Sequence, residues 1–182
     1  YAINASIHLA QVALHKGDLV GYAVFNDELA AFAEPKKGQA QMSHLVRNLT
    51  ALQPTRLESD YSAVFHHVLR NCSRRTLIVC FTDLNDDHLA NSLLKASLSL
   101  MPRHLPVIVT VSNSEILAVT RKVPDNEFEV YRNVAATEIW NDYQRTLRGF
   151  RSRGVATVSV PAGELSTAAI NEYLRIKESA RL

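Results

Sequence analysis

Several features that define common protein classes are scarce or missing in this sequence of 182 residues. It has only two cysteines, Cys72 and Cys80, whose spacing matches no zinc or redox motif, so we expect reduced thiols. No apolar run approaches the roughly 18 residues that a membrane-spanning helix needs, and no signal peptide is recognisable. The 20 basic and 18 acidic residues give a formal charge of +2, too small to indicate a nucleic-acid or anionic membrane surface.

The short motifs of common enzyme classes are also missing. The chain has no Gly-x-Gly-x-x-Gly, no phosphate-binding Gly-x-x-x-x-Gly-Lys, no Gly-x-Ser-x-Gly and no His-Glu-x-x-His. These absences argue against the usual nucleotide-binding, hydrolase and protease classes. The adjacent His66 and His67 would point to different sides of a helix, so they do not form a chelating pair.

What the sequence does contain is the composition and patterning of one α/β domain. Its 47% hydrophobic and 21% charged residues are typical of a globular protein, and its length allows one sizeable core. Apolar residues three and four positions apart predict helices, and continuous apolar runs predict buried strands. The predicted helices span residues 1–16, 42–52, 61–69, 89–100, 112–122, 125–153 and 164–177, and the predicted strands span 19–25, 29–33, 77–81, 104–111 and 155–160.

The order of these elements predicts the architecture. Alternation of strands and helices favours a mostly parallel sheet with helices on both faces. The tight turn at Asn26 and Asp27 indicates that the first two strands pair antiparallel, which makes one of them an edge strand. The segment 125–153 is either one long helix or two helices joined near Ala136.

Polar residues at two strand or helix ends form the candidate site. The apolar run 77–81 ends at Asp83, and ligands of open α/β sheets bind outside the carboxyl ends of the strands. Ser59 precedes a predicted helix, and its hydroxyl could meet the Asp83 carboxylate at a Mg²⁺ ion, which prefers such oxygen ligands. The alternative role for these residues is helix capping. Ser59 or Asp60 could cap the helix that begins at residue 61, and one of Asp86 or Asp87 could cap the next helix. For Asp86 and Asp87, capping is the favoured role.

Two further interpretations remain open from the residues alone. One is a metal-dependent hydrolase, such as a phosphatase, that uses Asp83 as metal ligand or nucleophile, with only His88 and Asp60 as candidate acids or bases. The other is a domain without a metal that acts through surface patches. A basic stretch in the long helix is favoured as a solvated face, with a partner-docking patch as the alternative; it consists of Arg145, Arg148, Arg151 and Arg153.

Five short segments, in this order and spacing, carry a family resemblance. They are Tyr1-Ala2-Ile3-Asn4-Ala5, Lys16-Gly17-Asp18-Leu19-Val20-Gly21, Glu58-Ser59-Asp60-Tyr61, Thr82-Asp83-Leu84 and Asn171-Glu172-Tyr173-Leu174. With them the sequence resembles the bacterial family called domain of unknown function 58, whose conserved part is a von Willebrand factor A-like domain. The resemblance covers essentially the whole chain.

The resemblance implies a doubly wound sheet of six strands, one antiparallel at the edge, with a metal-ion-dependent adhesion site on top. By motif, Ser59 would be the hydroxyl of its second loop and Asp83 the carboxylate of its third. The Asp-x-Ser-x-Ser of the first loop is absent from this chain, and so is the central strand before it. We therefore expect residues 1–182 to be one domain that is incomplete at its N-terminus. The missing central strand would leave a gap between strands 19–25 and 77–81. The alternatives are that these two strands pair directly, or that something else fills this gap.

The function implied by the resemblance is a non-catalytic protein-interaction module. The Mg²⁺ of this module would keep an open coordination position for a partner's carboxylate. Members of the family are similar to adaptor or chaperone-like partners of MoxR-type AAA+ ATPases. We accordingly expect no enzymatic activity, no nucleic-acid binding and no direct membrane contact from these residues. The expected location is the cytoplasm. The resemblance also allows the protein to be tethered to the membrane through segments outside this chain.

Overall fold

A computed structural model of the protein describes residues 1–51, 58–101 and 103–179. Its helices are α1 (Ala2–His15), α2 (Gln39–Thr50), α3 (Tyr61–Asn71), α4 (Asp87–Leu100), α5 (Ser114–Arg121), α6 (Glu127–Ser152) and α7 (Leu165–Glu178), with one 3-10 turn at Ala162–Glu164. Its strands are β1 (Val20–Phe25), β2 (Leu29–Lys36), β3 (Leu77–Phe81), β4 (Leu105–Val111) and β5 (Ala156–Val160). Every predicted helix and strand is present, although the predicted end of the second helix, Leu52, lies outside the described residues. The fold is mixed α/β.

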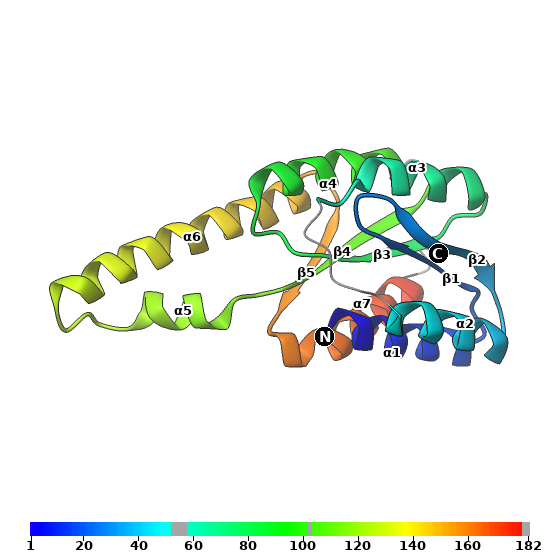
Figure 1. Cartoon of the computed structure of the whole chain (residues 1–182), viewed down its shortest axis with the longest axis horizontal. Helices are drawn as coiled ribbons and strands as arrows, with labels where there is room; N and C mark the ends of the chain where they lie inside the picture. The colour runs from blue at the N-terminus through cyan, green and yellow to red at the C-terminus, as the bar shows by residue number, and fades with distance from the viewer. Residues whose placement is uncertain (52–57, 102, 180–182) are drawn as a thin grey trace.

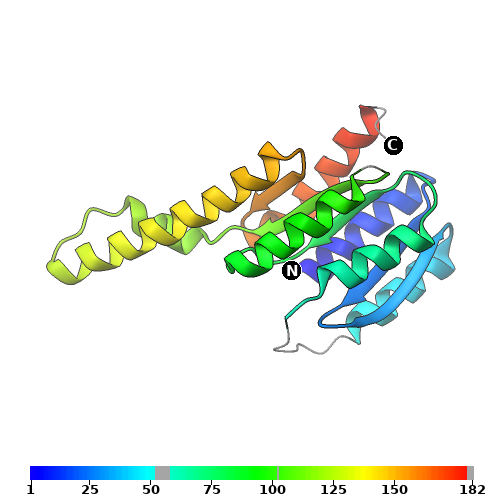
Figure 2. The ribbon, with the colours of Figure 1, turned by 90° about the horizontal axis from the view of Figure 1, so that it is seen from above.

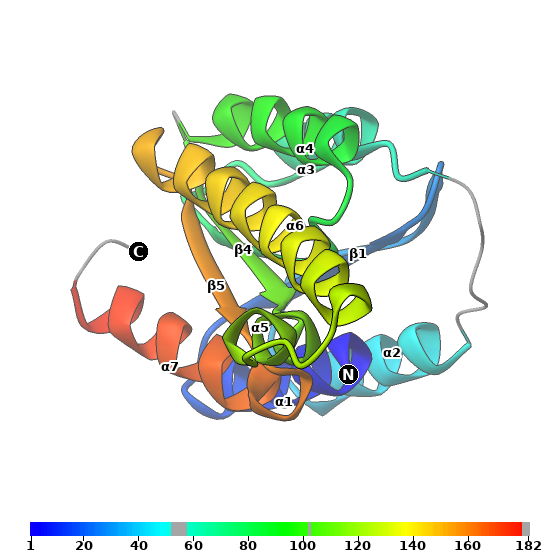
Figure 3. The same ribbon diagram turned by 90° about the vertical axis from the view of Figure 1, so that its left-hand side faces the viewer.

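The centre of the molecule is a parallel sheet of three strands in the order β3-β4-β5. Leu77 lies beside Leu105, and Val107 lies beside Ala156. Helices α3, α4 and α6 lie on one side of this sheet, and α1 and α7 lie on the other (Figures 1 and 3). Because both faces are covered, the residues from Pro106 to Thr110 are buried although they point alternately to opposite sides, which explains why β4 is almost entirely apolar.

Two apolar clusters fill the space between these layers. The larger cluster joins α3, α4 and α6 to the sheet; its members include Val64, Phe65, Leu93, Leu100, Ile108, Leu147 and Phe150. The smaller cluster joins α1 and α7 to the opposite face; it contains Ala5, Val107, Val109, Leu165, Ala169 and Ile176. The clusters place the core on both sides of β4, as expected for a strand without a solvent face.

Strands β1 and β2 form a separate antiparallel pair. A glycine is required at position 21, because a Cβ there would lie 2.7 Å from the carbonyl oxygen of Ala33. Strand β2 extends to Lys36, beyond the predicted end at residue 33, and it includes Pro35. Proline is tolerated in such a strand because β2 has a paired neighbour on one side only among the described residues.

The predicted single sheet is thus present as two sheets. Strands β1 and β3 are not hydrogen-bonded to each other in the described residues, so the alternative of direct pairing is wrong. Both strands nevertheless contribute side chains, including Phe25 and Ile78, to the same apolar cluster beneath α3. The two sheets therefore share one core, while β1 and β3 each have a strand edge with no neighbouring strand among the described residues.

A small polar cluster fastens α7 to the loop after α1. The Tyr173 hydroxyl donates to Asp18 Oδ2 and the Lys177 ammonium donates to Asp18 Oδ1, each at 2.6 Å. Burial alone would raise the pKa of Asp18, but the hydrogen bonds from Lys177 and Tyr173 outweigh it and hold that pKa below its usual value. Asp18 is therefore ionised and bound at neutral pH.

Helix α6 is one continuous helix, and its N-terminal half leaves the body of the molecule together with α5 (Figures 1 and 2). We call residues 113–139 the arm. The Asn133 side-chain amide donates to the carbonyls of Val119 and Lys122, both at 2.9 Å. These bonds, with the 2.7 Å ion pair between Lys122 and Glu129, hold α5 against α6.

Candidate functional site

Three segments meet at the edge of the molecule where β1 and β3 end. They are the turn after β1, the Ser59 to Tyr61 segment before α3, and the loop from Thr82 to Asp86 after β3. The Asp60 backbone N–H donates to the Asn26 carbonyl at 3.1 Å, which ties the second segment to the first. The Thr82 N–H donates to the Val109 carbonyl at 3.1 Å, so the third segment begins as an extension of the sheet.

Tyr61 connects the segments that carry Ser59 and Asp83. Its side chain is 3% exposed, and its hydroxyl shares a 2.6 Å hydrogen bond with the Thr82 hydroxyl. Burial raises the pKa of Tyr61 above its usual value; hydrogen bonds with Thr82 and Ser59 act in the opposite direction, and the negative charge of Asp83 adds to the increase. The Tyr61–Thr82 hydrogen bond therefore places the segment that carries Ser59 beside the loop that carries Asp83.

The Asp83 side chain is exposed but held in one orientation. Its Oδ1 accepts the Asn85 backbone N–H at 3.1 Å, and its Oδ2 accepts the Asn85 side-chain amide at 2.9 Å. Leu84, between them, is buried in the larger apolar cluster and anchors the loop. Because each carboxylate oxygen has further lone pairs, these bonds orient Asp83 without using up its capacity to bind a cation.

Helix capping is carried out by the other acidic residues. Asp60 caps α3 by accepting the Ala63 N–H at 2.9 Å, and Asp86 caps α4 by accepting the Leu89 N–H at 2.9 Å. Asp87 lies in the first turn of α4, where its Oδ1 accepts the Thr146 hydroxyl at 3.4 Å. The capping prediction is confirmed for Asp86, and Asp60 rather than Ser59 is the cap of α3.

The oxygen donors of Ser59 and Asp83 are of the kind that Mg²⁺ binds, but they are few. Within residues 1–51, 58–101 and 103–179, no group of three or more His, Cys, Asp or Glu side chains is arranged to hold a metal ion. One hydroxyl and one carboxylate fit part of an oxygen-rich coordination shell, and the other positions would need water or further ligands. Of the candidate acids and bases, His88 is exposed on α4, and Asp60 is engaged as a cap.

Sequence reasoning missed two residues of this site. Tyr61 lies in the apolar stripe of α3, and its ring packs edge-on against Phe25, with the ring centroids 5.8 Å apart. Nothing in the apolar period indicated that its hydroxyl would face the loop after β3. Asn85 carried a weak signal, because a side-chain amide two residues after an aspartate is typical of a tight polar loop.

The fold and this edge define an α/β protein with a polar corner formed by the loops before α3 and after β3. The family described as "Protein of unknown function DUF58" matches residues 1–151, and the chain belongs to this family, as the sequence resemblance predicted. No curated protein and no solved structure matches the chain. Among the described helices, none combines the length and the apolar character needed to cross a membrane.

Proposed function

We propose that this protein is a non-catalytic protein-interaction module built on a von Willebrand factor A-like domain with a metal-ion-dependent adhesion site. In this proposal the Ser59 hydroxyl is the second-loop ligand and the Asp83 carboxylate is the third-loop ligand. The observation that supports it is the hydrogen bond between Tyr61 and Thr82, which joins the segment that carries Ser59 to the loop that carries Asp83 at the edge where β3 ends. Since Asp60 and Asp86 cap the neighbouring helices, neither Ser59 nor Asp83 is needed for that purpose.

The arrangement of the two sheets supports the von Willebrand factor A-like assignment. Strands β1 and β3 each lack a second neighbouring strand among the described residues, although both pack on the same core. Buried backbone groups need hydrogen-bond partners, so a further strand between β1 and β3 would satisfy both edges. We propose that this strand comes from outside residues 1–182 and brings the Asp-x-Ser-x-Ser ligands to the edge that holds Ser59 and Asp83.

In the proposed site the chain's own residues hold and orient the cation. Ser59 and Asp83 supply oxygen ligands, Asn85 fixes the orientation of the Asp83 carboxylate, and Tyr61 holds the two segments together. A bound Mg²⁺ supplies an open coordination position for a carboxylate of the partner. From the family resemblance, the proposed partner is a MoxR-type AAA+ ATPase, for which the protein would act as an adaptor or chaperone-like component.

The test is a titration of Mg²⁺ or Mn²⁺ into the protein by calorimetry, together with capture of a purified MoxR-type ATPase with the ion or with chelator. We expect Asp83→Ala and Ser59→Ala to weaken metal binding at least about tenfold, or about 1.4 kcal/mol. Capture should weaken in the same variants. The matched control is Asp27→Asn, which removes an exposed carboxylate from the turn after β1.

The proposal is wrong if Asp83→Ala leaves both metal affinity and capture unchanged. Capture that persists in chelator and in Asp83→Ala would support a domain that acts through surface patches. Turnover of p-nitrophenyl phosphate that is lost in Asp83→Ala would support the metal-dependent phosphatase instead.

A further inference from the structure

The arm exposes an apolar stripe on α6. Phe128, Tyr131, Ala135 and Ile139 recur at intervals of three and four residues, which places them on one side of the helix. The three large side chains are 74%, 75% and 53% exposed, and Val134 beside them is also exposed. Over the twelve residues 128–139 the stripe runs along about 17 Å of helix. A continuous apolar stripe of this kind, unlike scattered exposed residues, marks an interaction surface.

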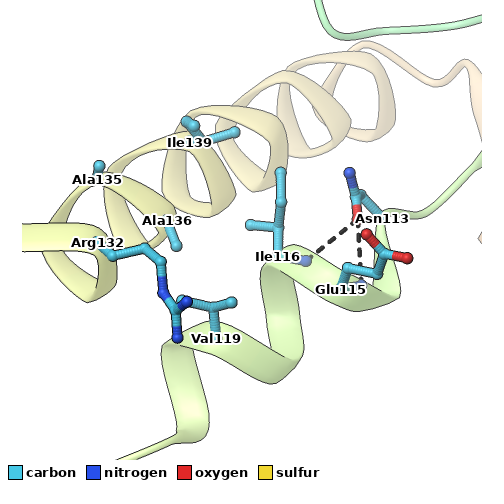
Figure 4. Close-up of a pocket in the computed structure, with 8 residues that line it drawn as sticks. All are labelled: Asn113, Glu115, Ile116, Val119, Arg132, Ala135, Ala136 and Ile139. Carbon is cyan, nitrogen blue, oxygen red and sulfur yellow. Dashed lines mark hydrogen bonds between the residues drawn. The ribbon is translucent and has the colours of Figure 1, made fainter. Parts of the chain in front are cut away.

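Helix α5 does not cover this stripe. It packs against another side of α6, where Asn133 and Glu129 make their bonds to it. Figure 4 shows Ala136 on the side of α6 that faces α5, and Ala135 turned away from α5 at the rim of the groove between the two helices. Ala135 and Ile139 also border a groove of about 310 Å³ between the two helices. Helix α6 is therefore apolar on two sides in the arm, and α5 accounts for only one of them.

The charges of α6 differ between its two ends. In α6 itself, residues 127–139 carry three acidic side chains and one basic side chain, whereas the helix from Arg145 onward has three arginines, followed by Arg153. Arg145 pairs with Asp142 of its own helix at 2.8 Å, but its side chain remains exposed. Glu127 and Glu138 form no ion pair within the part of the chain that the structure describes. A second α6 packed in parallel would bring like charges together, whereas an antiparallel copy would bring the acidic end of one helix to the basic end of the other.

The stripe itself is also suited to an antiparallel copy. Tyr131 lies four residues before Ala135 and Ile139 lies four residues after it, so a two-fold axis at Ala135 would set Tyr131 of each copy against Ile139 of the other. The small side chain at the centre allows the two helices to approach closely. In the same register, Glu127 is eight residues before the centre and Arg145 is ten residues after it, which brings the two charges to nearly the same level.

We infer that a second copy of this chain covers the stripe, and that the two α6 helices pack antiparallel with their crossing near Ala135. The interface is isologous, because each copy contributes the same apolar stripe and both charged ends. It uses Phe128, Tyr131 and Ile139 as apolar anchors and pairs Glu127 with Arg145 of the partner copy. It is separate from the Ser59 and Asp83 corner and does not depend on the proposed metal site.

The first test measures self-association of the whole chain by sedimentation equilibrium over a range of concentrations. We expect a monomer–dimer equilibrium whose dissociation constant increases at least about tenfold in Ile139→Glu, because the change puts a charge into the apolar interface. The matched control is Asn141→Glu, which adds the same charge at an exposed position outside the stripe. Circular dichroism should show that both variants are folded, since both positions are exposed.

The second test measures the geometry by cross-linking. In the inferred dimer Ala135 of the two copies face each other, so Ala135→Cys should form an intermolecular disulfide rapidly under mild oxidation. Asn141→Cys lies six residues away, so its two copies would be about 18 Å apart along the helix and should not cross-link. The native chain is the blank, because Cys72 and Cys80 are both buried.

Three outcomes would overturn the inference. The first is a chain that stays monomeric at every concentration, and the second is a dimer that Ile139→Glu and Asn141→Glu affect equally. The third is cross-linking of Asn141→Cys as fast as that of Ala135→Cys.

If the monomer instead binds phosphatidylcholine vesicles and Ile139→Glu abolishes that binding, the stripe contacts lipid and the inferred dimer is wrong. A metal titration of Ile139→Glu that matches the native chain would show that this surface and the proposed metal site are independent.

Discussion

The two halves of α6 carry similar apolar side chains in opposite surroundings. In the C-terminal half, Tyr143, Leu147 and Phe150 are buried against the sheet, and the Tyr143 hydroxyl shares a 2.6 Å hydrogen bond with Ser159. In the N-terminal half, Phe128 and Tyr131 are about three-quarters exposed. A single helix with one continuous backbone thus belongs both to the core and to a projecting arm. The comparison separates helix formation, which is local, from burial, which depends on what packs against the helix.

The body and the arm are also fastened by different interactions. The body is held by apolar clusters on both faces of the sheet and by Asp18 with its two donors from α7. The arm is held by the two hydrogen bonds of Asn133 and the surface ion pair of Glu129 with Lys122. We therefore expect changes in the body to alter the global free energy of unfolding, and changes in the arm to act locally.

The largest effect is expected for Phe150→Ala. Phe150 is 1% exposed within the larger apolar cluster, so its truncation removes buried surface and leaves a cavity. The free energy of unfolding should fall by about 3–5 kcal/mol, measured by urea denaturation followed by circular dichroism. A loss below about 1 kcal/mol would mean that the C-terminal half of α6 is not part of the cooperative core, and would remove the contrast with the arm.

A smaller, pH-dependent effect is expected for Asp18→Asn. The pKa of Asp18 is lower in the folded protein than its usual value of about 3.9, so the ionised carboxylate stabilises the fold above that pH. This contribution is lost as the pH falls through the folded-state pKa. At neutral pH the variant should be less stable by about 1 kcal/mol, a value reduced for partial exposure to solvent. The difference from the native chain should shrink below about pH 4.

The matched control for this pH effect lies in the arm. The hydrogen bond from Lys122 and that from the Asp125 backbone lower the pKa of Glu129 as well. Glu129→Gln should nevertheless leave the global unfolding curve unchanged and only accelerate amide hydrogen exchange in α5. Equal effects of Asp18→Asn and Glu129→Gln on global stability would contradict the distinction between body and arm.

The smallest effect is expected for Phe128→Ala. Its ring is exposed in the single chain, so truncation should change the free energy of unfolding by no more than about 0.5 kcal/mol. The measurement is the same urea denaturation, at concentrations where the chain is monomeric. A cost comparable to that of Phe150→Ala would show that the stripe is covered within one chain.

The elements of the fold were predictable because apolar period and apolar runs reflect local geometry. The stripe of Val64, Phe65 and Val68 predicted α3, and the unbroken run of β4 predicted a strand covered on both faces. The extension of β2 through Pro35 was not predictable, because proline usually ends a strand unless the strand has a free side. The division into two sheets was also beyond the sequence, since a strand's period does not reveal its neighbours.

The candidate site was predictable only in part. Asp83 could be selected because it ends an apolar strand, but the choice between Asp86 and Asp87 as the cap of α4 needed the hydrogen bond from Leu89 to Asp86. The choice between Ser59 and Asp60 as the cap of α3 needed the hydrogen bond to Ala63. Tyr61 was beyond prediction, because its ring belongs to the apolar stripe while its hydroxyl bonds to a residue 21 positions away.

The sequence by itself determined where the helices and strands lie, because side-chain period and chain-breaking residues act over a few positions. It also determined that Asp83 follows the end of an apolar strand. Only the tertiary structure decided which strands are neighbours, that the segments carrying Ser59 and Asp83 are joined by the Tyr61–Thr82 hydrogen bond, and that one side of α6 in the arm has no cover in the described chain. These features depend on contacts between residues far apart in the chain, and such contacts leave no periodic signal in the sequence.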